Sequence, residues 1–565
     1  MFENAIISYV NRLLFSSPRS VGVKMIRTIH TRIVGKYNVL SSRSVIYSSR
    51  SVLPGAPSGP LRSRETSSIA GVAPSLATTD SHSLPRPHSE IPGPRSWPLL
   101  GTLPAMLTDP AYDAHRLPKL WESYFKKYGP IFKLNLIGQG DVIYISDPRD
   151  IEHLYKEMFD NPVRPFLESI TAVREKSKRQ FFKERGPGIF TEQGERWWRL
   201  RKRVQTHSLR PSTVAQYLPQ VDQVAQEFVA RSAGQRDHKS ELPGDFVQEL
   251  YKWALESLCL VALNKRVGCL ENSEEGLRII NSSTTMMDAS GDCEYGVHLW
   301  KYFTTPALRR MLHSHDDLLE VVLEKVGQAK KDLEARDPKD LGELNILESL
   351  LTTPGLSFED VVTFMVDLFF AGIDTTSMTS VFALYYLARH PDKQARLQQE
   401  LDQVLGDGSQ ALTTHQMARL TYTKACVKEA LRLQPTTSVV ARRPDKDVTL
   451  QGYTVKAGTY MFVSIKESSM REEYFPRATE YLPERWLRAN PDRSDNIFAS
   501  IPFSMGTRMC LGKRLAEQEV YVLLARLFSK YNLDYKYEEW DPLFRVTYRP
   551  DKPQTFTMTE RSCLP

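Results

Sequence analysis

One cysteine of this sequence stands in a pattern that suits chemistry. The segment 503–512 reads FSMGTRMCLG and leads directly into an apolar stretch that predicts a helix. Its glycines allow a tight turn and a close approach of the backbone to a flat group. A cysteine at a helix start has its thiolate favoured by the helix dipole and by free N–H donors. The pattern therefore predicts a thiolate ligand presented from a glycine loop, with these distinctive positions: Phe503, Gly506, Arg508, Cys510 and Gly512.

This thiolate suits a haem iron better than a zinc ion, because no second ligand lies close to Cys510 in the sequence. The six cysteines form no CxxC pair and are too scattered for a disulfide framework or a zinc template. A phosphate-binding P-loop is an alternative at Gly506 to Lys513. It fails because the spacing is one residue too long and Arg514 stands where a hydroxyl residue is needed.

A second reactive pattern lies in the middle of a long apolar segment. Ser357 and Asp360 form a capping-box pattern and Pro391 ends the apolar run, which predicts one helix of about thirty residues. The helix is apolar on all sides, so we expect it to be buried. At its centre, Asp374 precedes Thr375 in the sequence AGIDTT. Gly, Asp and Thr are weak helix formers, so we expect the helix to be locally loosened there.

With these residues in view, the cysteine loop resembles the haem-binding loop of the cytochrome P-450 family. The resemblance extends from about Ile91 to the C-terminus, with the motifs in family order. It implies a haem b cofactor, with Cys510 as the ligand of the iron. It also implies these haem-contacting residues: Trp197, Arg201, Arg442, Phe503 and Arg508. Arg443 competes with Arg442 for the position beside the haem propionate, and the sequence leaves both open.

Three further charged residues resemble a structural network of the family. Glu429 and Arg432, in KEALR, match the ExxR motif and lie one helical turn apart, and Arg485 follows in LPERW. The same spacing recurs at Glu275 and Arg278, so the motif depends on its position between the long helix and the cysteine loop. Buried charges persist only when they are paired, so we interpret the three residues as architectural.

The activity implied by the resemblance is reductive activation of O₂ by a monooxygenase. A thiolate ligand pushes electron density toward the iron and favours cleavage of the O–O bond. By similarity, Thr375 holds the hydrogen-bond network of the oxygen and Asp374 relays protons to it. The product is expected to be a hydroxylated lipophilic molecule.

Basic residues around the cysteine loop indicate an acidic electron donor. Lys424 and Lys428 share a face of the helix that carries Glu429, and Lys513 and Arg514 follow the cysteine. Such a patch attracts an acidic partner. The pattern KxxxKExxR also resembles the mitochondrial branch of the family, whose members are reduced by an adrenodoxin-type ferredoxin.

The N-terminal leader has the composition of a mitochondrial transit peptide. Residues 1–90 hold eleven basic and four acidic residues, leaving 63 of each in the rest of the 565-residue chain. Spaced cations among apolar and serine residues fit organelle import, whereas a secretory or membrane-spanning segment needs an uninterrupted apolar run. The formal charge of +7 therefore belongs to the leader and indicates no nucleic-acid partner.

The remaining chain predicts one large, mainly α domain with a small β region (α+β), the cytochrome P-450 fold. Strands are predicted at 131–136 and 142–145 around Gly138 and Gly140, and again at 448–455 and 460–465. We assign 1–60 to a transit peptide, 61–90 to a Pro/Ser-rich linker and 91–565 to the monooxygenase domain.

Two other functions stay open at this point: a haem-thiolate enzyme that rearranges a peroxide, and a non-enzymatic haem-binding protein. Members of the first kind tend to lack the acid and alcohol that Asp374 and Thr375 provide. The motifs resemble invertebrate members, and a steroid-like substrate is the family-level expectation. We expect Phe369 and Phe370 to line the pocket. The aromatic segment 300–303 predicts peripheral membrane contact, on the matrix side of the inner mitochondrial membrane.

Overall fold

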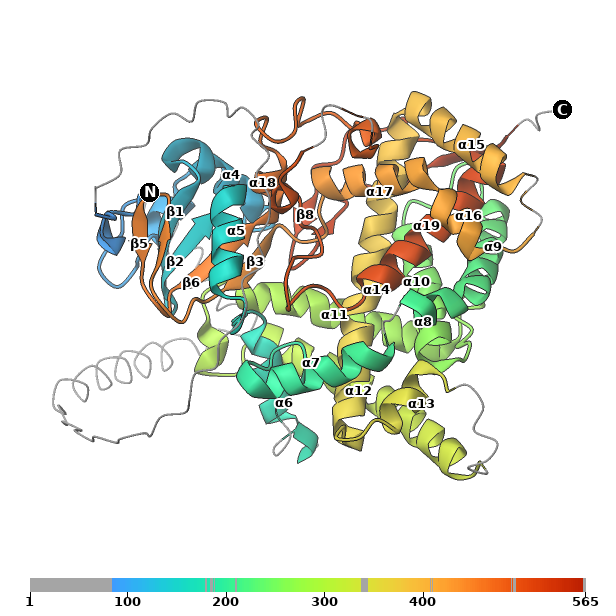
Figure 1. The fold of residues 1–565 in the computed structure, drawn as a ribbon, viewed down its shortest axis with the longest axis horizontal. Helices are drawn as coiled ribbons and strands as arrows, with labels where there is room; N and C mark the ends of the chain where they lie inside the picture. Colours follow the sequence, from blue (N-terminus) through green and yellow to red (C-terminus); the bar gives the residue numbers. More distant parts are fainter. Residues whose placement is uncertain are drawn as a thin grey trace, which may run out of the picture. The chain divides into compact units, whose positions relative to one another are not determined.

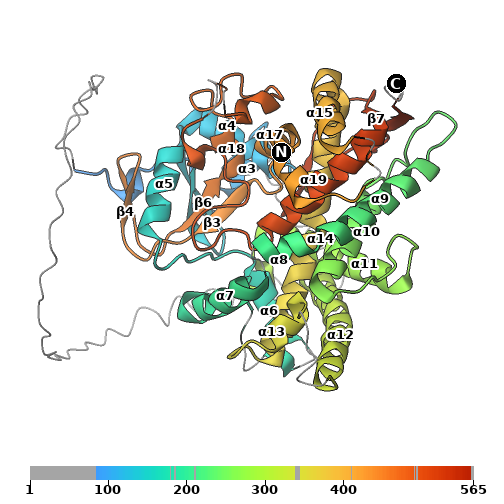
Figure 2. The ribbon, with the colours of Figure 1, turned by 45° about the vertical axis from the view of Figure 1, so that its right-hand side comes forward.

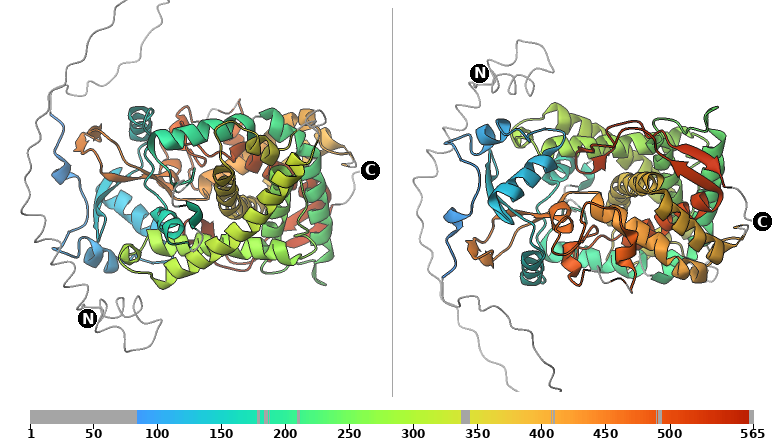
Figure 3. Two further views of the ribbon diagram at one scale, coloured as in Figure 1. Left: turned by 90° about the horizontal axis from the view of Figure 1, so that it is seen from below. Right: turned by 90° about the horizontal axis from the view of Figure 1, so that it is seen from above.

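The computed structural model describes residues 84–561, except 178–179, 183–185, 187, 209–210, 337–343, 407, 409, 489 and 491–493. The predicted transit peptide, 1–60, and most of the predicted linker, 61–90, lie outside the described residues. The described residues belong to one unit, 82–565. Helices dominate it; most strands gather on one side, whereas the strands drawn in red near the C-terminus lie on the opposite side (Figures 1 and 3). The predicted single, mainly α domain is confirmed.

Three of the predicted strands join in one sheet across more than 300 residues of sequence, whereas the strand predicted at 448–455 is instead a separate two-stranded hairpin. Strand β1 (Ile131–Leu136) pairs antiparallel with β2 (Gly140–Ile145), β2 pairs parallel with β6 (Tyr460–Ser464), and β6 pairs antiparallel with β3 (Val439–Arg442). The sheet order is β1-β2-β6-β3. Arg442, expected just before a strand, is instead the last residue of β3.

Three two-stranded ladders complete the β structure: β4–β5, β7–β10 and β8–β9. Their bounds are β4 Val448–Leu450, β5 Tyr453–Val455, β7 Tyr531–Asp534, β8 Leu543–Phe544, β9 Tyr548–Arg549 and β10 Thr557–Glu560.

The helices surround a central one, α14 (Phe358–Arg389), which runs through the unit and packs against α10, α11, α12, α17 and α19 (Figures 1 and 2). The others are α3 Leu103–Leu107, α4 Leu117–Tyr128, α5 Pro148–Glu157, α6 Glu168–Lys176, α7 Gly194–Ser208, α8 Pro211–Gln216, α9 Leu218–Gly234, α10 Val247–Leu263, α11 Glu274–Glu294, α12 Pro306–Glu334, α13 Ile346–Leu351, α15 Pro391–Leu405, α16 Thr414–Arg419, α17 Thr421–Leu433, α18 Ile465–Ser469 and α19 Lys513–Lys530.

Helix α14 begins as its sequence predicts. Ser357 Oγ accepts a hydrogen bond from the Asp360 N–H, and the Asp360 carboxylate accepts one from the Ser357 N–H. The expected loosening is wrong: α14 is a continuous helix through AGIDTT. Thr375 Oγ1 donates to the Ala371 carbonyl at 2.7 Å, a bond that a helix tolerates without breaking.

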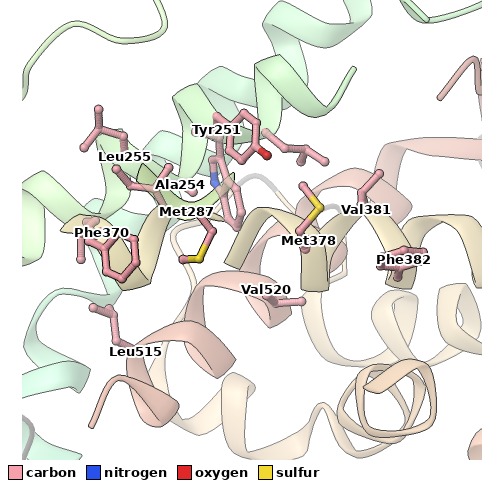
Figure 4. Packing of buried hydrophobic residues seen from close by; sticks show 14 of the residues in the cluster. Tyr251, Ala254, Leu255, Met287, Phe370, Met378, Val381, Phe382, Leu515 and Val520 are labelled. Carbon is pink, nitrogen blue, oxygen red and sulfur yellow. The ribbon is translucent and has the colours of Figure 1, made fainter. Parts of the chain in front are cut away.

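Among the described residues, α14 is the one helix long and apolar enough to cross a membrane. Of its most apolar stretch, 78% is buried inside the protein, which marks it as a core helix. Figure 4 shows Phe370 and Met378 of α14 packed among Tyr251 of α10, Met287 of α11 and Leu515 of α19. The hydrophobic core therefore fixes α14 relative to α19, the helix that follows Cys510.

Candidate functional site

The cysteine loop is a compact turn ahead of α19. The Cys510 N–H donates to the Phe503 carbonyl at 3.0 Å, which closes the loop on itself. Gly506 has φ +72°, in the region that favours glycine. Helix α19 begins at Lys513, so the sulfur of Cys510 lies at a helix start, as predicted.

Cys510 is the accessible cysteine of the described part of the chain. The other cysteines described there, Cys259, Cys269, Cys293 and Cys426, are all buried. Although accessible, the thiol is largely enclosed by protein, and this burial raises its pKa above the usual value. The N–H groups of Gly512 and Lys513 and the charge of Arg201 oppose that rise. The predicted stabilisation of the thiolate is therefore present but does not outweigh the cost of burial.

Four arginines gather beside the loop. Arg508 lies 3.7 Å from the ring centroid of Trp197, and Arg201 donates to the Met509 carbonyl at 2.7 Å. Arg442 donates to Ser504 Oγ, a residue of the loop, at 3.0 Å. The fourth is Arg164, whose charge acts on Cys510, Arg442 and Arg508.

These four cations have no carboxylate partner within 4 Å among the described residues. Burial and mutual repulsion lower the pKa of Arg508 to about 8, and burial lowers the pKa values of Arg164 and Arg201 to about 10. Arg508 Nη1 is buried without a hydrogen-bond partner in this part of the chain. Buried cations need anions. The cluster therefore fits the two carboxylates of a haem.

Gly512 also indicates that a flat group such as a haem lies against the loop. Its φ of −78° is open to any residue, and a Cβ added there would meet no protein atom within 4 Å. Neither backbone conformation nor protein packing requires a glycine at this position. A flat group lying against the loop would require one, so the donor set and the loop surface both fit a thiolate-bound haem.

The structure separates the two arginines that the sequence left open. Arg442 is 2% exposed and contacts both Tyr155 and Ser504 at 3.0 Å. Arg443 is 39% exposed in its side chain, and its guanidinium lies 3.8 Å from Glu168, outside the cluster. The geometry favours Arg442 beside the haem.

Asp374 is fully buried and receives three hydrogen bonds. They come from Tyr251 Oη at 2.9 Å, Thr547 Oγ1 at 2.6 Å and Arg549 Nη2 at 2.9 Å. Arg549 also reaches Asp288 at 3.1 Å, and the two acids raise its pKa although burial lowers it. Asp374 is therefore held by α10 and the C-terminal strands, which the sequence did not predict.

The charged network of the ExxR motif forms as predicted. Arg432 donates to both oxygens of Glu429, at 2.9 and 2.8 Å, and Arg485 donates to the same carboxylate at 3.0 Å. Trp486 Nε1 adds a bond at 2.8 Å. All three charged side chains are at most 2% exposed. In the similar pair on α11, Glu275 is half-buried and Arg278 is exposed, and each has a separate partner.

The four predicted docking cations lie around one acid. Lys424, Lys428, Lys513 and Arg514 all lower the pKa of Glu517, against burial that raises it. Lys424 also donates to the Met417 carbonyl at 2.6 Å and so satisfies the C-terminal end of α16. Burial lowers the pKa of Lys424. Lys428 is exposed, and its Nζ lies 6.0 Å from the ring centroid of Trp486.

The apolar residues that were predicted to line the pocket or to meet the membrane are placed by the structure. Phe369 and Phe370 are at most 2% exposed and Phe370 packs in the core (Figure 4), so their position in the pocket wall stays a prediction. Trp300 is 4% exposed and donates to the Cys293 carbonyl, so it is a core residue and not a membrane anchor. Tyr302 is 64% exposed.

Comparison with known proteins agrees with this geometry. The family model described as Cytochrome P-450 matches residues 91–557. A protein named probable cytochrome P-450 49a1, from Drosophila melanogaster, is 33% identical over 515 residues, which cover 88% of this chain and 87% of its own. The probable mitochondrial cytochrome P-450 301a1 of the same fly is 32% identical over 89% of this chain and 95% of its own. The mitochondrial cytochrome P-450 12b1 of Drosophila acanthoptera is 33% identical over 80% and 85%.

The family match covers most of the chain, and the match contains the cysteine loop, the arginine cluster and the ExxR network. The resemblance read from the sequence is confirmed. The chain belongs to the cytochrome P-450 family, and it is a haem-thiolate monooxygenase.

Proposed function

We propose that this monooxygenase works in mitochondria, where it hydroxylates a lipophilic, sterol- or steroid-like substrate with O₂ and electrons from an adrenodoxin-type ferredoxin. The observation that carries the proposal is the loop of Cys510 beside four arginines that lack carboxylate partners among the described residues. Cys510 is the proposed ligand of the iron. A thiolate-bound haem supplies reductive activation of O₂.

The residues around the loop bind and orient the cofactor. Arg201, Arg442 and Arg508 would neutralise the haem carboxylates, and Trp197 supports Arg508 from below its guanidinium plane. Arg164 is the fourth arginine proposed to neutralise the haem carboxylates. Phe503, whose carbonyl closes the loop, fixes the direction of the Cys510 backbone.

Asp374 and Thr375 are the proposed route for protons. Thr375 Oγ1 donates a hydrogen bond to the Ala371 carbonyl, and its lone pairs can accept a further hydrogen bond. The Asp374 carboxylate must exchange one of its three donors before it can hand on a proton.

Replacing Thr375 by alanine is expected to preserve haem binding and the thiolate spectrum, because the described hydrogen bond of the hydroxyl goes to a helix carbonyl. Product formed per NADPH consumed should fall about tenfold or more, since positioned proton transfer is lost. Product, NADPH and hydrogen peroxide are measured together. Ser380→Ala removes a similar hydroxyl, bonded to the Thr376 carbonyl, and should leave coupling intact. Equal coupling in wild type and Thr375→Ala contradicts the role.

The cluster of Lys424, Lys428, Lys513 and Arg514 is the proposed docking surface for the ferredoxin. All four act on Glu517, so they are close enough to present one positive region. The cations outnumber the acid, which leaves a net positive surface on α17 and α19.

Reversing the charge of Lys428 is expected to weaken the ferredoxin complex about tenfold at low salt and less at high salt. Lys428 is the better test than Lys424, whose ammonium also satisfies carbonyls of α16. Kd is measured by titration at two ionic strengths. Lys330→Glu, on α12, is the matched control, because Lys330 lies beside Phe358 at the start of α14 and not on α17 or α19. A loss that does not depend on salt contradicts docking through this patch.

Mitochondrial import rests on the leader and on relatives that carry the word mitochondrial in their names. We assign residues 1–60 to the transit peptide, 61–90 to a linker and 91–565 to the catalytic domain. Exposed Tyr302 and the cations Arg309 and Arg310 that follow it are the proposed peripheral contact with the matrix side of the inner membrane.

Reconstitution with a mitochondrial ferredoxin, its reductase and a set of sterols tests the function. A substrate should shift the spin state of the haem iron, start ferredoxin-dependent NADPH consumption and yield a hydroxylated product. Conversion of a hydroperoxide without NADPH would instead identify a peroxide-rearranging enzyme. Haem binding with no turnover by either route would overturn the proposed activity.

A further inference from the structure

Helix α6 is held in place by polar contacts with three longer helices. Its nine residues are too few for a helix that is stable alone, and no side chain caps its N-terminus. The Ser169 N–H donates to the carboxylate of Glu294, on α11, at 3.0 Å. At the other end, Ser177 Oγ donates to Asp316, on α12, at 2.7 Å. The position of α6 therefore depends on its tertiary partners.

The third contact is a buried ion pair with the central helix. Arg174 Nη2 donates to Asp367 Oδ1, on α14, at 2.6 Å, and the two side chains are 1% and 3% exposed. The other oxygen of Asp367 accepts from the Phe190 N–H at 3.2 Å. Gly188 has φ +83°, and a Cβ there would lie 2.8 Å from Arg174 Nη1, so only glycine fits beside the pair. A buried charge is costly unless it is paired, so each member requires the other.

His315 completes this contact from α12. Its side chain is fully buried, and burial lowers its pKa, so the imidazole is neutral near pH 7. Arg174 Nε donates to His315 Nε2 at 3.4 Å, and the proton on Nδ1 then faces Asp316 at 3.4 Å. Both bonds are long, and one tautomer of the imidazole serves both. Arg174 therefore lies where α6, α12 and α14 meet.

The ion pair lies at the edge of the least covered side of α14. Between residues 361 and 385 every residue of this helix is buried except five, which are half-buried: Leu368, Ala371, Gly372, Thr375 and Thr379. Their spacing of three and four residues places them along one stripe of the helix. Because Thr375 belongs to this stripe, the stripe faces the proposed reaction site. Asp367 directly precedes its first member.

We propose that the pair of Arg174 and Asp367, supported by His315, positions α6 as a wall of the substrate site beside this stripe. The inference rests on the proposed place of Thr375 in the reaction. With the wall in position, a large lipophilic molecule meets a preformed surface. Without the pair, α6 leaves this position in part of the molecules, and the apparent affinity falls with the fraction that remains competent to bind. The three side chains are thus positioning residues, which act on the substrate through α6.

The test uses the haem-loaded protein and two azoles that bind the iron through nitrogen, small imidazole and bulky, lipophilic clotrimazole. The Kd of each is measured from the spectral shift on ligation. Arg174→Met should raise the Kd of clotrimazole about tenfold or more and that of imidazole less than about twofold, because only the large ligand needs the wall. Asp367→Asn removes the charge but keeps the shape, and should do the same. It carries the test if Arg174→Met does not fold.

Arg526→Met is the matched control. Arg526, on α19, forms an equally buried pair with Asp222, on α9, through bonds of 2.5 and 2.6 Å. Loss of either arginine breaks a buried pair and should lower the free energy of unfolding by a similar amount. Only Arg174→Met should change the Kd of clotrimazole, so stability and positioning are measured apart.

Weaker binding of clotrimazole alone, in the Arg174 and Asp367 variants but not in Arg526→Met, supports the wall. Wild-type affinity for clotrimazole in both of those variants overturns it. Equal weakening of the two azoles, or weakening of clotrimazole by Arg526→Met, overturns it as well, because either would show a general loss of structure. Turnover of the reconstituted wild-type protein and the coupling of Thr375→Ala are measured separately, so failure here leaves the proposed monooxygenase function untouched.

Discussion

Serine in place of Cys510 is expected to abolish the red-shifted band that a thiolate ligand gives to the reduced carbon monoxide complex. Serine is nearly isosteric, and the hydrogen bond of residue 510 to the Phe503 carbonyl uses the backbone, so the loop should keep its shape. Turnover should fall by more than the roughly 10–100-fold typical of removing an outer partner of a metal ligand. The measurements are the carbon monoxide difference spectrum and product formation with saturating ferredoxin.

Cys293→Ala provides the matched comparison, since Cys293 is 2% exposed and lies outside the arginine cluster. Its spectrum should equal that of wild type. A thiolate-type spectrum retained by Cys510→Ser would mean that another residue ligates the iron. Loss of the spectrum in both variants would mean that the effect is one of folding.

Local sequence patterns were sufficient to predict the elements that position the site residues. The capping box at Ser357 and Asp360 located the start of α14, because its hydrogen bonds join residues three apart. The glycine loop and the ExxR pair could be predicted for the same reason, because in each of them the residues that contact one another lie only a few positions apart in the sequence. The sequence did not predict that α14 continues unbroken through AGIDTT. Tertiary packing on all sides outweighs the weak helix propensity of Gly, Asp and Thr.

Local patterns could not predict contacts between residues that lie far apart in the sequence. Arg164 joins the arginine cluster, but its surroundings in the sequence carry no motif. Thr547 and Arg549 hold Asp374 from more than 170 residues away. Glu517 could have been noticed one helical turn after Lys513. Its charge matters because it offsets part of the basic patch.

The choice between Arg442 and Arg443 also needed the structure, because adjacent residues at the end of β3 face opposite sides. Arg442 lies in the arginine cluster beside the cysteine loop, whereas Arg443 lies outside it, 3.8 Å from Glu168.

Removing Arg432 is expected to have the largest effect on stability. Its guanidinium donates to Glu429 and to the carbonyls of Ser469, Ala478 and Glu480, all in a buried region. Arg432→Ala leaves these acceptors with one donor fewer each and weakens the pairing of a buried carboxylate. Loss of one member of a buried ion pair costs about 3–5 kcal/mol. We expect a comparable fall in the free energy of unfolding, with poor haem retention.

Arg278→Ala is the control that the sequence itself offers, because Arg278 completes the second ExxR pattern. That arginine is exposed on α11 and contacts Glu320 at 3.0 Å, an arrangement worth about 0–1 kcal/mol. Denaturant unfolding of the haem-loaded proteins compares the two variants. Equal losses would show that Arg432 contributes only as a surface charge does. A loss confined to Arg432→Ala, with Arg485 still facing Glu429, would show that the pair and its carbonyl partners hold the segment before the cysteine loop in place.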